Sequence, residues 1–229
     1  GARARALRTL AFRATVELCR ARLAAAGSGR FARIAAVLIA AGTFVIALSL
    51  RVTDGPATPV GGLLRKAAIA IAWMAGGAIA LAASRDAESV DRAEGVEALV
   101  AARGVGAGLL RAARTLGAMT LIGRTVGLPL AALALGTAGL APDVASALRR
   151  VVAGVALLLW GVIVAVTLGA LAAASARFFR ARGATALVVL VIGERLIADA
   201  AGLGAWSVPG ALEAALSIAL GATGVGGGR

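Results

Sequence analysis

The 229-residue chain is 60% apolar and 15% charged, with a mean hydropathy of +0.93 and a formal charge of +13. Soluble domains average about 45–50% apolar and about 25% charged residues, so this composition excludes an ordinary soluble protein and predicts an all-α, polytopic membrane protein. The chain has no histidine and one cysteine, Cys19, which excludes histidine-dependent catalysis, histidine-metal sites and an internal disulfide. The arginines flank apolar stretches instead of forming a basic face with stacking residues, so we expect no nucleic-acid partner.

Residues 1–33 are predicted to form a basic N-terminal helix that lies at the membrane interface. Within residues 3–25, Leu7, Leu10 and Leu18 share one face at helical spacing, with arginines elsewhere. Such a helix would rest on membrane lipid and lie near a partner protein. The alternative is a basic tail that only orients the first span.

Six apolar stretches are candidate membrane spans, because a span needs about 17–25 residues. They occupy residues 34–50, 67–83, 116–139, 151–174, 184–206 and 208–225. We expect residues 34–225 to form one six-helix transmembrane domain, followed by a tail at 226–229. Pro209 suits the first turn of the sixth span, whereas Gly221 and Gly224 weaken its end. The abundance of Ala and Gly predicts closely packed helices.

Basic residues in the short connectors predict the orientation of the spans. Eight arginines precede the first span, and Arg177, Arg180 and Arg182 lie between the fourth and the fifth. Both termini are therefore expected in the cytoplasm, together with the connector after the second span. Short outer turns are expected near Asp143 and at residues 206–209.

The connector at residues 85–114 holds five of the eleven acidic residues, which must be solvated, so it is predicted to leave the membrane. Residues 86–103 are expected to form a helix that Gly104 and Gly106 stop. Four residues of this helix keep helical spacing: Val96, Leu99, Val100 and Arg103. A short amphipathic helix suits docking into a protein groove. The alternative is a solvated helical loop that holds the second and third spans apart.

At this connector the chain resembles the type-2 permeases of ATP-binding-cassette (ABC) exporters. In that family an E-x-G-x-x-E-x-L-like stretch follows the second span, and then come a Gly or Pro and a helix that runs back into the membrane. The matching residues are Glu94, Gly95, Glu97 and Leu99, followed by Gly104, Leu109, Leu110 and Arg114. The basic first helix, the six spans and the charged connector follow the order of the family over nearly the whole chain.

The resemblance implies that residues 86–103 are the coupling helix that meets a separate ABC ATPase subunit. The partner-binding residues would be Glu94, Gly95, Glu97, Leu99, Val100 and Arg103. The chain has no G-x-x-x-x-G-K-[ST] loop, so ATP and Mg would be bound by the partner and this chain would need no cofactor. The resemblance also implies a second permease subunit, identical or different, and a location in the bacterial inner (cytoplasmic) membrane.

Within the same superfamily, the chain is similar to the membrane subunit of the haem exporter of cytochrome c maturation. Its length and six spans carry this similarity, together with Trp73 and the run Gly127, Leu128, Pro129 and Leu130. The absence of histidine departs from that pattern, because it leaves a haem without an obvious ligand.

Three charged residues fall inside predicted spans: Arg124, Glu194 and Arg195. At 1.5 Å per residue, Arg124 and Glu194 are both about 12–15 Å from the cytoplasmic boundary. An unpaired charge at that depth is costly, so we expect these two to form an ion pair. Arg195 is expected to pair with Asp199, four residues on, or to extend toward the interface. The alternative is that one of these residues lines a polar route and contacts a charged substrate group.

Together these features predict the permease subunit of an ATP-driven transporter, an exporter by its resemblance, which transmits movement of the ATPase through the coupling helix. A non-transporting membrane scaffold or a small channel component is the alternative. An enzyme is not expected, because the sequence has no nucleophile-base set and no paired carboxylate motif.

Overall fold

The computed structural model describes residues 2–54, 60–85, 95–179 and 182–225, and within these ranges it contains helices and no strand. The predicted all-α fold is confirmed for this part of the chain, and the predicted tail at 226–229 lies outside it. In chain order the elements are α1 (Ala2–Ala25), α2 (Gly27–Asp54), α3 (Val60–Ile71), the π-helix η2 (Ala72–Gly76), α4 (Gly77–Ala83), α6 (Val96–Ala101), α7 (Ala107–Ala138), α8 (Val144–Phe179), α9 (Gly183–Ala200), the 3-10 helix η4 (Gly204–Trp206) and α10 (Val208–Ala222).

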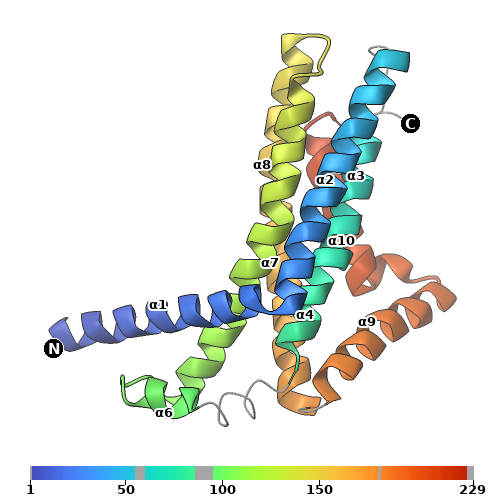
Figure 1. Cartoon of the computed structure of the whole chain (residues 1–229). Helices are drawn as coiled ribbons and strands as arrows, with labels where there is room; N and C mark the ends of the chain where they lie inside the picture. The colour runs from blue at the N-terminus through green and yellow to red at the C-terminus, as the bar shows by residue number, and fades with distance from the viewer. Residues whose placement is uncertain (1, 55–59, 86–94, 180–181, 226–229) are drawn as a thin grey trace.

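Helix α1 lies across one end of the bundle of long helices (Figure 1). Its corner with α2 is tight, because a Cβ at Gly29 would lie 2.2 Å from the carbonyl oxygen of Leu23. Arg33 Nη2 donates to the carbonyl oxygen of Ala24 at 2.8 Å, which satisfies an acceptor that the end of α1 leaves free. The N-terminal helix therefore ends well before residue 33, since Arg33 already belongs to α2.

Among the described residues, four helical segments are long and apolar enough to cross a membrane: Gly27–Thr53, Val60–Ala83, Ala107–Ala138 and Val144–Phe179. The second of them combines α3, η2 and α4. Each segment begins earlier than the corresponding predicted span, because hydropathy marks only the apolar part of a helix that also has polar end turns. The structure thus supports a membrane protein with several spans and does not confirm six.

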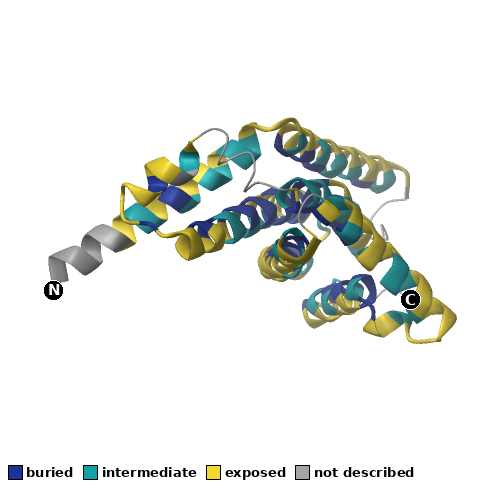
Figure 2. Cartoon of the chain, turned by 90° about the horizontal axis from the view of Figure 1, so that it is seen from below, coloured by how far each residue is buried: buried dark blue, intermediate teal, exposed yellow. Residues whose placement is uncertain are grey.

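The central contact of the bundle is the pair α7 and α8, which approach each other through glycines. A Cβ at Gly161 would lie 2.9 Å from Gly127 Cα, and a Cβ at Gly123 would lie 3.4 Å from Ala165 Cβ. Gly123 and Gly127 are one helical turn apart, so both face α8. The close packing predicted from small residues is confirmed here, and Figure 2 shows buried residues on the sides of the helices that face one another.

The second span contains a π-helix that the sequence did not predict. The N–H of Gly77 donates to the carbonyl oxygen of Ala72, five residues back. In an α-helix the acceptor would be the carbonyl oxygen four residues back. Gly76 lies against Val126 of α7 and Leu168 of α8. The wide turn is therefore in the middle of the bundle, and π-helices in such places frequently accompany functional sites.

Polar groups fix the turn between α7 and α8. Asp143 Oδ1 accepts from the backbone N–H of Ser146 at 2.8 Å and so caps α8. This N–H, followed by the Ser146 hydroxyl, holds the pKa of Asp143 below its ordinary value. Arg150 is buried and donates to the carbonyl oxygen of Thr137 at the end of α7. The short turn predicted near Asp143 is confirmed.

The fifth and sixth predicted spans are two separate helices, α9 and α10, with an interruption at residues 201–207 between them. Helix α10 is only 15 residues long, and α9 is not among the four segments long and apolar enough to cross a membrane. Helix α9 begins beside the end of α4, since a Cβ at Gly183 would lie 2.1 Å from the Ser84 carbonyl oxygen. Helix α10 ends beside the start of α8, where Thr223 and Val152 line one groove. The end of α10 therefore lies at the opposite end of the bundle from α1 (Figure 1), whereas the sequence placed both termini on one side. The orientation relative to a membrane stays a prediction.

Candidate functional site

The interruption between α9 and α10 is specified by residues that end and begin helices. Gly202 has a φ of +71°, and the N–H of Leu203 donates to the carbonyl oxygen of Ala198 at 2.7 Å, which closes the end of α9. After η4, Ser207 caps α10, because its hydroxyl oxygen accepts from the N–H of Gly210 at 3.1 Å. Both helix ends at the interruption are therefore capped, and the interruption has a defined structure.

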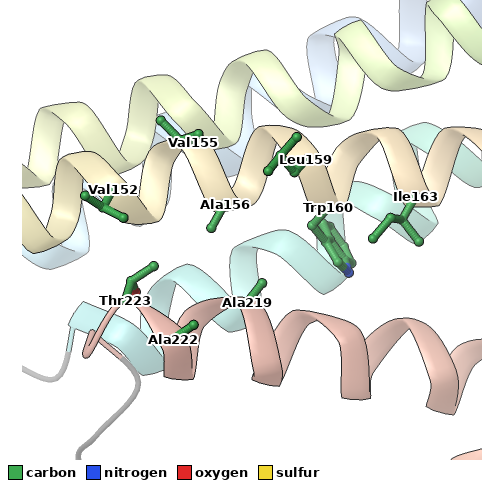
Figure 3. Close-up of a pocket in the computed structure, with 9 residues that line it drawn as sticks. All are labelled: Val152, Val155, Ala156, Leu159, Trp160, Ile163, Ala219, Ala222 and Thr223. Atoms are coloured by element: carbon green, nitrogen blue, oxygen red, sulfur yellow. The ribbon is translucent and has the colours of Figure 1, made fainter.

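The interruption lies at mid-depth in the bundle. Trp160, near the middle of α8, is 2% exposed, and its indole N–H donates to the carbonyl oxygen of Leu212 at 2.9 Å. Figure 3 shows this side chain pointing from α8 toward α10. Pro209, in the first turn of α10 as predicted, lines a groove together with Trp73 of η2. The turn predicted at residues 206–209 is thus not a loop at the end of the bundle, because two central helices flank it.

Glu194 binds the first turn of α10. Its Oε1 and Oε2 accept from the backbone N–H of Val208 at 2.9 and 3.1 Å. The first N–H groups of a helix have no partner within the helix and carry partial positive charge, so a carboxylate is favourable there. The carboxylate that was predicted to pair with Arg124 is therefore bound to a helix terminus.

Arg124 lies on an exposed face of α7, near Leu116 and Leu128, which are 43% and 58% exposed. The predicted Arg124–Glu194 ion pair is absent from the described part of the chain. The physical reason is lateral position: α9 packs on α8, α4 and α10, whereas Arg124 is on a side of α7 that no described helix covers. Equal depth along the sequence did not bring the two residues to adjacent faces.

Arg195 joins the two sides of the interruption. Its Nε donates to Asp199 Oδ2 at 2.8 Å, which confirms the predicted pair four residues apart. Its Nη1 lies 3.3 Å from Ser207 Oγ and 3.4 Å from the carbonyl oxygen of Gly204. One guanidinium therefore connects the last turns of α9 with η4 and with the residue that caps α10. Ser207 was not among the predicted site residues, although a Ser two residues before a Pro is a helix-start signal.

Two grooves flank α10. The first, of about 230 Å³, adjoins the interruption and is lined by Trp73, Val191, Ile192, Arg195, Leu196 and Pro209. The second, of about 340 Å³, lies between α8 and α10 and is lined almost wholly by apolar side chains (Figure 3). Of the two, the first contains a charged side chain and borders the π-helix. Its walls nevertheless expose almost only apolar surface, because the guanidinium of Arg195 is bonded to Asp199, Gly204 and Ser207.

The described part of the connector contains a shorter helix than predicted. Helix α6 comprises six residues, and Gly95, at φ +69°, precedes it. A residue in the left-handed region interrupts a right-handed helix, so no single helix runs through residues 86–103. Residues 86–94, including the predicted partner-binding residue Glu94, and the side chain of Glu97 lie outside what the structure describes.

Gly104 ends α6, as predicted. Its φ is +76°, and the N–H of Val105 donates to the carbonyl oxygen of Val100 at 3.2 Å. Val100 and Val105 are both buried in one cluster, the apolar contact that accompanies this type of helix end. Val100 therefore points inward, although it was predicted to be one of the partner-binding residues. Leu99 is 52% exposed, and Arg103 is exposed as well.

Gly104→Ala is expected to destabilise the end of α6 by about 1–2 kcal/mol, because a side chain is disfavoured at a φ of +76°. Hydrogen exchange at the amide of Val105 measures this, and it should become faster. Gly108→Ala is the matched control, since a Cβ there would meet nothing within 4 Å and its φ is not positive. Equal exchange rates in the two variants would contradict the assigned role of Gly104.

Comparison of the chain with protein-family models, with curated proteins and with solved structures found no match. Within the described ranges, no three Asp, Glu or Cys side chains gather in a way that could hold a metal ion. A functional conclusion therefore comes from the geometry around the interruption and from the connector.

Proposed function

We propose that this chain is the membrane-spanning permease subunit of an ATP-driven transporter. The observation that carries the proposal is the interruption between α9 and α10, with Glu194 and Arg195 at mid-depth in an apolar bundle. Transport proteins place helix ends and charged side chains at this depth, where they bind polar substrates or ions. Here Glu194 and Ser207 cap the start of α10, so a substrate would have to compete with these caps for the same N–H groups. Each charged residue there costs about 2.5–3.5 kcal/mol on insertion, a cost that a scaffold has no reason to bear.

The connector is the proposed docking site of a separate ABC ATPase subunit. Helix α6 is at the same end of the bundle as α1 (Figure 1), the end at which the basic residues predict the cytoplasm. Leu99 offers an exposed apolar side chain there, as an anchor for a groove on the partner requires. The chain lacks a phosphate-binding loop, so hydrolysis of ATP with Mg is assigned to the partner.

Movement of the ATPase would reach the membrane helices by a short route. Helix α6 is followed within a few residues by α7, and α7 is packed along α8 through Gly127 and Gly161. A displaced α6 would therefore move α7 and α8 together. Because α9 and α10 both pack on α8, this movement would change the surroundings of the interruption.

The proposal includes a second permease subunit, identical or different, in the bacterial inner membrane, and an export direction. The exposed face of α7 supports a second subunit: Arg124 lies there among Leu116 and Leu128. A guanidinium among leucines is unfavourable against lipid hydrocarbon. A second subunit or a polar route between two subunits would remove that contact.

Leu99→Asp tests the coupling role. Placing a carboxylate at the centre of an apolar anchor should lower the affinity for the ATPase and the MgATP hydrolysis of the purified complex at least about tenfold. Val52→Asp is the control, since Val52 is 79% exposed at the end of α2, at the other end of the bundle. Both variants should insert into the membrane and unfold at the same temperature as the original chain. If the Leu99→Asp variant still binds the ATPase and transports as well as the original chain, the coupling role is wrong and the scaffold or channel function is favoured.

A further inference from the structure

We infer that the α1 end of the bundle binds the head groups of anionic phospholipids through a collar of four exposed arginines. The arginine collar consists of Arg13 on α1, Arg30 on α2, Arg177 in the last turn of α8, and Arg182, which precedes α9. The inference is independent of the proposed transport function, because it concerns the surface around the bundle and not the interruption.

The four arginines lie on helices that gather at the same end of the bundle: Arg30, Arg177 and Arg182 near helix ends, and Arg13 in the middle of α1. Helix α1 packs on α7, α2 and α4. Gly183, next to Arg182, approaches the carbonyl oxygen of Ser84 just after α4. Figure 1 shows α1, the start of α2, the end of α8 and the start of α9 at the same end of the molecule. The charges are therefore distributed around one end and do not form a stripe on a single helix.

The described residues do not neutralise the collar. None of the four guanidinium groups forms an ion pair with a carboxylate in the described ranges. Glu17, the acidic residue of α1, is paired with Arg20, so among the described residues it does not neutralise Arg13. Like charges gathered at one end of a molecule raise the local concentration of anions, and arginine binds phosphate oxygens through two parallel hydrogen bonds.

Exposed apolar side chains beside the collar select an amphiphile over a free anion. Phe31 is 53% exposed next to Arg30, and Phe178 and Phe179 are 73% and 53% exposed next to Arg177. The guanidinium carbon of Arg177 lies 6.0 Å from the ring centre of Phe178. Phenylalanine and leucine side chains beside basic residues bury into the boundary between head groups and acyl chains. A lipid phosphate on an arginine would place its acyl chains along these rings.

Titration of the purified full chain with phosphatidylglycerol and with phosphatidylcholine tests the collar. The collar variant carries Arg13→Gln, Arg30→Gln and Arg177→Gln. The control variant carries three matching changes at exposed positions of the other end, Arg65→Gln, Lys66→Gln and Arg149→Gln. One basic residue near an anionic surface contributes about a fivefold factor in affinity. The collar variant should therefore bind phosphatidylglycerol about a hundredfold more weakly, while the control variant changes less than about twofold.

Three outcomes would overturn the inference. Equal affinity of the collar and control variants for phosphatidylglycerol would show that the collar does not bind it. Loss of binding in a folded variant that carries Lys at the same three positions would show that the charge of the collar is not the cause. Displacement of phosphatidylglycerol by millimolar inorganic phosphate would show that the site recognises phosphate alone. Thermal unfolding of each variant establishes that it is folded.

Discussion

Gly161→Ala is expected to weaken the pairing of α7 with α8 and to lower the free energy of unfolding by about 1–3 kcal/mol. The added Cβ would lie 2.9 Å from Gly127 Cα and 3.1 Å from Gly127 N. Both are backbone atoms, so no side-chain rotation relieves the contact and the two helices must separate. Gly161→Leu places a branched side chain in the same space and should prevent the helix pair from forming.

The control for Gly161→Ala is Gly42→Ala on α2, where a Cβ would meet nothing within 4 Å. Alanine is the better helix former by about 0.8–1.0 kcal/mol, so Gly42→Ala should leave the stability unchanged or raise it slightly. Thermal unfolding in detergent, followed by circular dichroism, measures both variants. If Gly161→Ala is as stable as Gly42→Ala, the close approach at Gly127 does not hold the helix pair together.

The close packing of α7 on α8 is a feature that composition and residue spacing can predict. Small residues one helical turn apart, such as Gly123 and Gly127, let two backbones approach, and this property is local to each helix. The end of α6 is similar, because Gly104 interrupts a run of good helix formers at the place where the structure ends the helix. Both features depend on residues close together in the chain. The end of the helix at Gly104 was predicted, whereas for the contact only close packing in general was predicted, from composition.

The depth of the interruption between α9 and α10 could not be predicted from hydropathy. Gly202, Ser207 and Pro209 are visible in the sequence as residues that end and begin helices. The same residues occur in a turn at the membrane surface and in a break at mid-depth, so they do not decide between two spans and one. The depth is decided by the contact of Trp160 with Leu212, two residues far apart in the chain.

Two local features left no signal in the sequence. The π-helix η2 adds one residue to a helical turn without a change in composition, so an apolar run that contains Trp73 looks the same with or without it. Gly95 lies inside an otherwise helical pattern, where a single glycine is tolerated. The sequence alone does not show that its φ is positive.

The prediction of an Arg124–Glu194 ion pair was wrong for a related reason. Counting residues from a span boundary gives the depth of a side chain, and a helical rise of 1.5 Å per residue makes that estimate useful. It gives neither the neighbours of a helix nor the face on which the residue lies. The partner of Arg195 was predicted correctly, because Asp199 is four residues away on the same helix and needs no knowledge of the bundle.

Glu194→Ala is expected to lower the free energy of unfolding by about 2–3 kcal/mol. The N–H of Val208 would lose both oxygens that it contacts at 2.9 and 3.1 Å, and an unsatisfied buried donor costs about 1–3 kcal/mol. The loss of negative charge at the start of α10 adds about 0.3–1 kcal/mol. Glu194→Gln keeps an acceptor for Val208 and should cost only about 1 kcal/mol. Thermal unfolding in detergent compares the two variants.

Glu213→Ala is the matched control for Glu194→Ala, because Glu213 is also a carboxylate near the start of α10 and its side chain bonds to nothing in the described part of the chain. Glu213→Ala should change the free energy of unfolding little, and equal losses of stability for Glu194→Ala and Glu213→Ala would argue against a capping role of Glu194.

Combining Glu194→Gln with Arg124→Gln separates the capping role of Glu194 from the ion pair that the sequence predicted. Residues that do not touch have additive effects, so the double variant should lose the sum of the two single losses. Recovery of stability in the double variant would instead mean that Arg124 pairs with Glu194 in the membrane, and that Val208 is capped by another group.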